Sequence, residues 1–410
     1  MKYRELLNEK DYMCNLSAQF ITRIGDGIDT IALSWLTYEI TGSASLVAIV
    51  YTVNMLPNLL FGIIGGGLSS YISEKNIMWI CDIGRGTTTL VIALLFWFNY
   101  LTIPLLFVLT FINSTFESLR TPAQMSIFQI IISQEKREKA LALQESTNNM
   151  ASLLGLGAGP LCIGLFGISG AIIIDATSFF ICAILVMMIS NHKRGIEEKF
   201  VSMKTYAKEI LEGMKYLGKS KLLVILCFFA CFMNALFVPI NAFEVVYIKD
   251  YLLLGMIGMS VSGVASVLGM IISPLFLPKL IEKISNRIII LSGGILLSLC
   301  YLSYALLPYS LMALRYALLA FIMFMLGVAL SLVNYPANLF FYNKIEEKYF
   351  ARVSAFIRCM SMAMQPLASV IFGFLSDFFP LTIIFYGCAI IVFFIFASQF
   401  FNKIFYELNG

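Results

Sequence analysis

Three ionisable residues, Arg23, Asp26 and Asp29, stand three positions apart in an apolar stretch near the start of the chain. In a helix, this spacing places their side chains on adjoining parts of one face. Carboxylates in apolar surroundings can bind and release protons, and one arginine cannot fully neutralise two aspartates. Two hypotheses therefore stay open: an Arg–Asp pair that fixes packing, and a spare carboxylate that carries a proton.

Other acidic residues also interrupt apolar stretches. Glu117 and Arg120 repeat the three-residue spacing, and a structural pair is slightly favoured because both lie towards one end of their helix. Asp175 has no partner within a turn of its own helix, so a relay role and a hydrogen bond to another helix are both open. Glu145 and Glu244 are expected near the ends of their helices, in contact with water.

The segment GMKYLGKS, Gly213–Ser220, fits the phosphate-binding pattern G-x-x-x-x-G-K-[ST]. That pattern binds a nucleotide only where it joins a strand to a helix in a βαβ unit. Here the apolar residues before and within the segment recur at helical spacing, as Tyr206, Ile210, Met214 and Leu217. The pattern therefore predicts an amphipathic helix on a membrane surface. A linker of about thirty residues is too short for a nucleotide domain, and we expect no nucleotide to bind.

The composition shows what surrounds these charges. Of 410 residues, 60% are hydrophobic and 13% are charged, and the mean hydropathy is +0.87. A water-soluble chain of this length could not bury so much apolar surface, so lipid must be its solvent. We expect an all-α integral membrane protein with twelve transmembrane helices of about 20 residues or more. The expected ranges are 15–40, 44–70, 77–98, 102–124, 141–165, 168–190, 222–247, 254–278, 287–307, 311–341, 353–376 and 380–402.

Lysine and arginine are spread unevenly over the expected loops. If the N terminus is cytoplasmic, the outside loops carry only Lys249 and Arg315, and the inside segments carry all the other basic residues that lie between the helices. Because basic residues are favoured on the cytoplasmic side, both termini are expected there. The first fifteen residues are charged and no A-x-A-like cleavage site follows, so no removable signal peptide is expected.

The cysteines and the histidine do not indicate metal or nucleophile chemistry. All nine cysteines lie in or beside apolar runs, without C-x-x-C spacing, and such residues usually serve as small hydrophobes. The single histidine, His192, can form neither a histidine metal site nor a catalytic triad. We therefore expect no metal, no cofactor, no nucleic-acid partner and no enzymatic activity.

An internal repeat divides the chain. The segment Arg120–Ala142 reads much like Asn334–Ala355, with Pro122 and Pro336 at matching positions. The two prolines are six expected helices apart, and an even offset keeps the orientation, so the repeat is a parallel one. This predicts a six-helix bundle over 1–190, a cytoplasmic linker with an amphipathic helix over 191–221, and a second bundle over 222–410.

Several segments carry a family resemblance. They are RIGDGIDTIALSWLTYEITGSA, LPNLLFGIIGG, CDIGRG, LRTPAQ, LGAGPLCIG, EGMKYLGKSK, VPINAF and FARVSAF. In order and spacing they resemble the major facilitator superfamily, and within it the macrolide-efflux branch of drug exporters, over nearly the whole chain. The resemblance implies two pseudo-symmetric six-helix bundles. Its Gly-Asp element makes Asp26 the preferred candidate for the proton carrier.

One loop departs from the family pattern. Between the second and third expected helices the family has Gly-x-x-x-Asp-Arg, where this chain has GGLSSYISEKN with Ser70 and Tyr71 at the Asp and Arg positions. The charge lock that helps to close the cytoplasmic side in relatives is therefore in doubt. Asp82 and Arg85, expected at the start of the next helix, are candidates for part of that gating role.

The segment GLGAGPLCIG concentrates small residues in one expected helix. Gly155, Gly159, Pro160 and Gly164 lie where helix backbones can approach closely and where the helix can kink. The segment resembles a shortened form of the exporter motif of the superfamily. Ordinary helix packing would also favour small residues here, so both interpretations stay open.

The resemblance implies a secondary active transporter of the bacterial inner membrane. It would export a lipophilic drug or antibiotic-like compound in exchange for protons, as the two halves rock about a site at the midplane. Its partners would be a small-molecule substrate, protons and the lipid bilayer, and it would function as a monomer. Two alternatives are a lipid or siderophore-type carrier on the same fold and a transport-dead membrane sensor or assembly factor.

Overall fold

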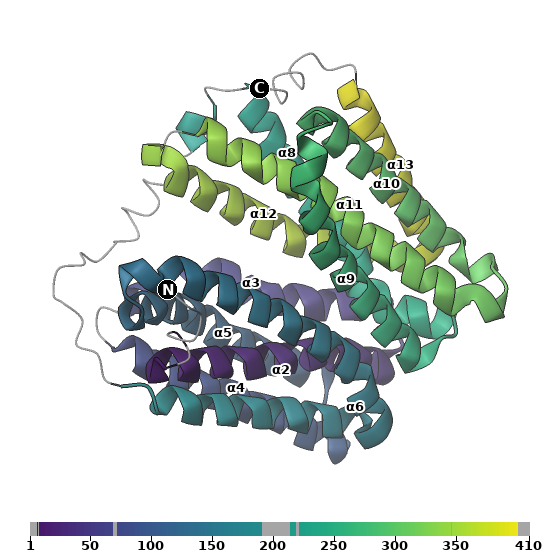
Figure 1. The fold of residues 1–410 in the computed structure, drawn as a ribbon. Coiled ribbons are helices and arrows are strands. Elements are labelled where there is room, and N and C mark those ends of the chain that lie inside the picture. Colours follow the sequence, from purple (N-terminus) through teal and green to yellow (C-terminus); the bar gives the residue numbers. More distant parts are fainter. Residues whose placement is uncertain are drawn as a thin grey trace. The chain divides into compact units, whose positions relative to one another are not determined.

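The computed structural model describes Leu6 and residues 8–68, 72–190, 214–218, 221–345 and 347–400 (Figure 1). Over these residues the long elements are all helices, and none is a strand. The first half contains α2 (Lys10–Thr41), α3 (Ala44–Leu68), α4 (Glu74–Trp97), α5 (Ile103–Ile131) and α6 (Arg137–Met187). The second half contains α8 (Lys221–Val246), α9 (Gly255–Ile281), α10 (Asn286–Leu306), α11 (Arg315–Lys344), α12 (Glu347–Ser376) and α13 (Leu381–Phe400).

The helix α6 is two helices joined at a sharp bend. Gly167 has φ 72° and ψ 175°, which interrupts the helical backbone between the two parts. Glycine adopts this positive φ readily because it has no Cβ. With this break, the described residues form twelve long helical segments, and the predicted boundary between 165 and 168 is confirmed.

Nine stretches of the described residues are long and apolar enough to cross a membrane, and one of them is the bent segment Lys139–Met187. The helices α2 and α5 are not among the nine. Both contain charged residues in their interiors. Such helices are tolerated in lipid when the charged face is turned into the bundle.

Several predicted features lie outside the described residues. These are Ser70 and Tyr71 in the loop before α4, and most of the predicted linker, residues 191–213 and 219–220, with the greater part of its amphipathic helix. By packing, the chain divides into two compact units, Met1–Gly42 with Val50–Thr205, and Ser43–Ile49 with Tyr206–Gly410. We keep the division into 1–190, 191–221 and 222–410 as a proposal.

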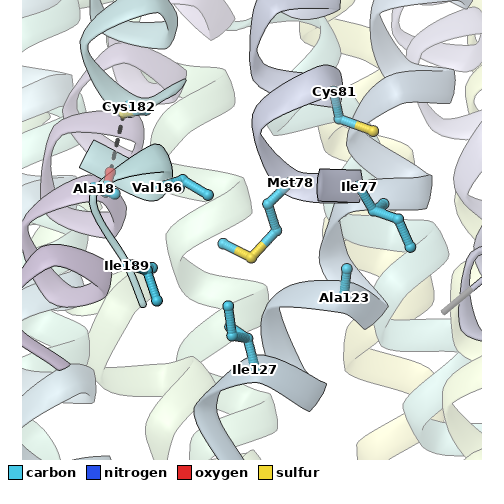
Figure 2. Close-up of a cluster of buried hydrophobic side chains, with 9 residues drawn as sticks. All are labelled: Ala18, Ile77, Met78, Cys81, Ala123, Ile127, Cys182, Val186 and Ile189. Carbon is cyan, nitrogen blue, oxygen red and sulfur yellow. Dashed lines mark hydrogen bonds between the residues drawn. The ribbon is translucent and has the colours of Figure 1, made fainter. Parts of the chain in front are cut away.

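In the first unit, α2 packs most extensively against α6, and α4 packs against α5 and α6. Figure 2 shows where these helices share a core, and there the Cys182 thiol donates a hydrogen bond to the Ala18 carbonyl oxygen over 3.2 Å. The buried side chains of this core are Ala18, Ile77, Met78, Cys81, Ala123, Ile127, Cys182, Val186 and Ile189. The charged residues described below lie on the same four helices, so this core fixes their positions.

The helix α4 begins earlier than the sequence analysis expects. Ser73 caps it, because its side chain accepts a hydrogen bond from the Asn76 amide, and Glu74 lies in the first turn. The start at Glu74 rather than at residue 77 puts Arg85 midway along the helix, which ends at Trp97. The expectation that Asp82 and Arg85 lie at the start of this helix is therefore wrong.

In the second unit, α9 packs against α11, α10 packs against α11 and α13, and α8 packs against α12. Arg315, at the start of α11, binds the loops beside it. Its guanidinium donates hydrogen bonds to the carbonyl oxygens of Leu252 (2.8 Å), Pro308 (2.6 Å) and Ser310 (3.4 Å). This arginine is one of the two basic residues that the sequence analysis assigns to outside loops, and these carbonyl oxygens explain its presence there.

Replacing Arg315 by Ala is expected to lower the free energy of unfolding by about 1.5–3 kcal/mol, the range for hydrogen bonds to a charged group. Arg315→Lys should lower the free energy of unfolding by nearly as much. The compact lysine ammonium cannot reach all three carbonyl oxygens, as the planar guanidinium does. Thermal melting of the purified protein in detergent micelles checks this. Lys279→Ala, at an exposed position of α9, is the matched control and should melt with the wild type. An Arg315→Ala protein as stable as this control would contradict the assignment.

Candidate functional site: a charged pocket in the first unit

A small polar pocket opens between α2, α4 and α5, with a cavity volume of about 40 Å³. It is lined by Gln19, Thr22, Arg23, Asp26, Arg85, Glu117, Arg120, Thr121 and Gln124. Asp26 lies midway between the ends of α2 at Lys10 and Thr41, and Arg85 lies midway along α4. The pocket is therefore at the middle of these two helices rather than at a helix end.

The guanidinium of Arg85 is the main partner of Asp26. The Arg85 Nη2 atom lies 2.9 Å from the Asp26 carboxylate, whereas the Arg23 Nη1 atom lies 3.9 Å from it. The Arg23 side chain is 54% exposed and the Arg85 side chain is 5% exposed. The predicted pair Arg23–Asp26 is thus the weaker contact, because exposed ion pairs contribute little. The Arg85 guanidinium also stacks 4.1 Å above the ring of Phe179.

Arg120 forms an ion pair with a residue of another helix, not with the predicted Glu117 of its own helix. Its Nε atom lies 2.5 Å from the Asp82 carboxylate of α4, and both side chains are buried. Its Nη1 atom donates a hydrogen bond to the side-chain oxygen of Gln124. The predicted pair Glu117–Arg120 is therefore wrong. Glu117 lies 3.9 Å from Arg85 instead, because both α5 residues turn their side chains towards α4.

Two further carboxylates lie beside Arg85 without touching it. Asp175 of α6 is fully buried, and its Oδ1 atom accepts a hydrogen bond from the Ser178 hydroxyl over 3.4 Å. The expectation that Asp175 has no partner within a turn is wrong, although its Oδ2 atom has no hydrogen-bond partner among the described residues. Asp29 of α2 has no hydrogen-bond donor in the described part of the chain, and it interacts electrostatically with Asp175 and Arg85.

Arg85 therefore faces four carboxylates. It contacts Asp26 and Glu117, and it attracts Asp29 and Asp175 electrostatically. Even with the half-exposed Arg23, 3.9 Å from Asp26, two guanidiniums cannot neutralise four ionised carboxylates. An unpaired charge inside a membrane bundle costs several kcal/mol, so this arrangement needs further positive charge. A proton is the smallest species that supplies it.

Gly25 makes room for the Asp175 side chain. A Cβ at Gly25 would overlap with the Asp175 carboxylate and with the Ser178 hydroxyl. The glycine that precedes Asp26 is thus needed for close approach between α2 and the second part of α6.

Gly25→Ala is expected to lower the free energy of unfolding by about 1–3 kcal/mol, as overpacked buried positions do. Melting temperature in detergent is the measurement. Gly387→Ala is the matched control, because a Cβ there meets nothing within 4 Å in α13, so the change should be neutral or slightly stabilising. Adding Asp175→Ala to Gly25→Ala should restore part of the loss. A Gly25→Ala protein that melts with the wild type would exclude this packing role.

The predicted small residues of α6 also contact α2. A Cβ at Gly155 would lie 2.7 Å from the Ile24 carbonyl oxygen, and one at Gly159 would lie 3.3 Å from the Ile28 Cα atom. Backbones approach closely at both positions. Pro160 lies inside α6, and Gly164 is exposed. The structure thus places the first two glycines at a helix contact, and their part in gating stays a proposal.

Sequence reasoning missed two buried amides. Asn15 and Gln19, on successive turns of α2, are fully or nearly fully buried, and none of their side-chain amide atoms has a hydrogen-bond partner among the described residues. Gln19 lines the pocket. The sequence could have indicated them, because Asn15, Gln19 and Arg23 are four residues apart. This spacing continues the polar face of the helix towards its start. Among the described residues, no cluster of histidine, cysteine and acidic side chains is arranged to hold a metal ion.

Comparisons with known proteins agree with this architecture. The macrolide efflux protein A of Streptococcus pyogenes is 22% identical over 362 residues, 88% of this chain and 88% of that protein. The uncharacterized MFS-type transporter YkuC of Bacillus subtilis is 27% identical over 232 residues, 55% of this chain and 53% of that protein. The crystal structure of the nucleoside transporter NupG superposes with a TM-score of 0.79 at 15% identity, covering 97% of this chain and all of that one.

The family model described as Major Facilitator Superfamily matches residues 16–369. The matched residues cover most of both halves of the chain. The twelve helical segments and the fold shared with solved transporters agree with the match. The chain therefore belongs to the Major Facilitator Superfamily.

Proposed function

We propose that this transporter exports a lipophilic drug or antibiotic-like compound across the bacterial cytoplasmic membrane, driven by protons that move inward. The observation that carries the proposal is the buried guanidinium of Arg85 among four carboxylates in the middle of the first unit. Asp26 is in direct contact with Arg85, and we assign it the role of counter-ion. Among the described residues, no cation contacts Asp29 or Asp175, and these are the carboxylates to which we assign proton binding.

This assignment changes the role expected for Asp26. The sequence analysis prefers Asp26 as the proton carrier, and the geometry instead favours it as the counter-ion of Arg85. Arg120 and Asp82 neutralise each other, so we assign them to holding α4 and α5 together rather than to coupling. Arg23, more than half exposed at the pocket mouth, would adjust the local field without being required.

The direction of transport and the substrate class rest on relatives. The macrolide efflux protein A extends over most of this chain, and its name indicates export of a macrolide. A macrolide is therefore the first probe to use. The predicted distribution of basic residues places both termini in the cytoplasm, and we propose that a monomer is the functional unit.

Accumulation assays in a bacterial host that lacks its own efflux pumps test the proposal. Cells that express the chain should accumulate less radiolabelled macrolide than cells with an empty vector, and a protonophore should abolish the difference. Export should persist when ATP is depleted while the proton gradient is maintained. Export that survives the protonophore, or export of none of a panel of macrolides and lipophilic cations, would overturn the proposed function.

A further inference from the structure

The second unit holds a buried acidic side chain that the pocket of the first unit does not involve. Glu244 lies near the end of α8, partly buried, and its carboxylate accepts a hydrogen bond from the Ser262 hydroxyl of α9. Ser262 itself is fully buried. Glu244 is expected in contact with water, and its partial exposure allows this, but the structure also gives it a buried protein partner.

An aromatic layer lies beside this carboxylate. Tyr247, Tyr304 and Phe385 are fully buried, and their ring centroids are 4.6–5.0 Å apart. Tyr247 donates a hydrogen bond to the Tyr304 carbonyl oxygen over 2.7 Å. The Tyr304 hydroxyl interacts electrostatically with Glu244 and has no hydrogen-bond partner among the described residues. The chain then continues from α8 into a π-helix, Tyr247–Tyr251, an irregularity that is common at functional sites.

No cation accompanies Glu244. Within the described part of the chain, no lysine or arginine forms an ion pair with it, and the groups that face it are Ser262 and Tyr304. Arg315 is occupied by three carbonyl oxygens, and Lys249, on the following π-helix, has interactions of its own. A carboxylate in this position needs a neutralising charge. A proton is the smallest species that supplies this charge.

We propose that Glu244 is a proton-binding site of the second unit, with Ser262 as its hydrogen-bond donor and the Tyr304 hydroxyl beside it. The proton would be taken up by a carboxylate oxygen from water and released to water, with no other bond formed or broken. Each unit would then carry its own proton site. The part of Glu244 in coupling rests on the proposed function, but proton binding itself does not.

Infrared difference spectra of the purified protein, recorded between pH 9 and pH 6, test proton binding without any substrate. Exposed glutamates, with a reference pKa of about 4.3, stay ionised over this range and contribute no protonated-carboxyl band. Labelling of all glutamates with ¹³C shifts glutamate bands and leaves aspartate bands in place, so Glu244 is distinguished from Asp29 and Asp175. We expect one protonated-glutamate band, and Glu244→Gln should remove it.

Two further variants keep the test decisive if Glu244→Gln does not fold. Ser262→Ala retains the carboxyl group but removes its donor, so the carbonyl stretch should move to higher frequency. Glu145→Gln, at an exposed position of α6, should leave the band unchanged. The absence of a ¹³C-sensitive carboxyl band would overturn the proposal. So would a band that persists in Glu244→Gln, or one that stays in place in Ser262→Ala. All three of these results would leave the proposed export function untouched.

Discussion

Replacing Arg120 by Leu is expected to lower the free energy of unfolding by about 3–5 kcal/mol, the range for removing one partner of a buried ion pair. Arg120 and Asp82 are 4% and 0% exposed, and their contact of 2.5 Å joins α5 to α4. Without the guanidinium, the Asp82 carboxylate would remain buried with no counter-charge. Asp82→Asn should be destabilising for the converse reason.

The double change Asp82→Asn with Arg120→Gln should recover much of the lost stability, because it removes both charges and keeps hydrogen-bonding groups. The matched control is the exposed pair Glu9–Lys136, whose atoms lie 2.7 Å apart with side chains 45% and 24% exposed. Glu9→Gln should cost no more than about 1 kcal/mol. Thermal melting in detergent measures all four proteins. An Arg120→Leu protein that melts with the Glu9→Gln control would show that the buried pair does not hold the two helices.

The second large effect concerns Arg85. Arg85→Gln is expected to reduce proton-driven export at least about 100-fold, equivalent to roughly 2.7 kcal/mol on the limiting barrier. The change removes the nearest cation of Asp26, leaving it only the exposed Arg23, and it removes the cation that contacts Glu117. It also removes the charge that attracts Asp29 and Asp175. The positive charge that assists release of the proton from Asp29 and Asp175 would then be missing, and the transport cycle would fail.

Arg23→Gln is the matched control, because it makes the same change on the exposed arginine 3.9 Å from Asp26. It should retain most of the export. The double variant Arg85→Gln with Asp26→Asn separates coupling from stability. It should fold better than Arg85→Gln alone, since the uncompensated carboxylate is gone, and it should still not export against a gradient. Export at the wild-type rate by a folded Arg85→Gln protein would remove this arginine from the mechanism.

The helices could be predicted from the sequence because lipid imposes a simple rule. Each span needs about 20 apolar residues, and the bend at Gly167 lies at the predicted break. The predicted first residues of the helices were less accurate. The start of α4 depends on a cap between the Ser73 side chain and the Asn76 amide rather than on hydropathy, which does not register a capping serine.

The ion-pair partners of the charged residues could not be predicted from their spacing in the sequence. A three-residue spacing reports neighbours on one helix, and it suggested Arg23 with Asp26 and Arg120 with Glu117. The closest contacts instead join different helices, Arg85 to Asp26 across 59 positions and Arg120 to Asp82 across 38. Those distances depend on how α2, α4 and α5 pack. The ionisable residues themselves were identifiable, since each interrupts an apolar run, whereas the roles of Asp26 and Asp29 depend on which of them Arg85 contacts.

The central claim, that Asp29 and Asp175 hold the coupling proton, is tested most directly by comparing uphill export with exchange in proteoliposomes. Exchange of radiolabelled macrolide across the membrane without a gradient needs no net proton movement, whereas uphill export does. We expect Asp29→Asn and Asp175→Asn to retain exchange and to lose uphill export. Asp377→Asn, at an exposed position after α12, should retain both. The claim would be contradicted if both variants built the same substrate gradient as the wild type, or if they lost exchange together with export.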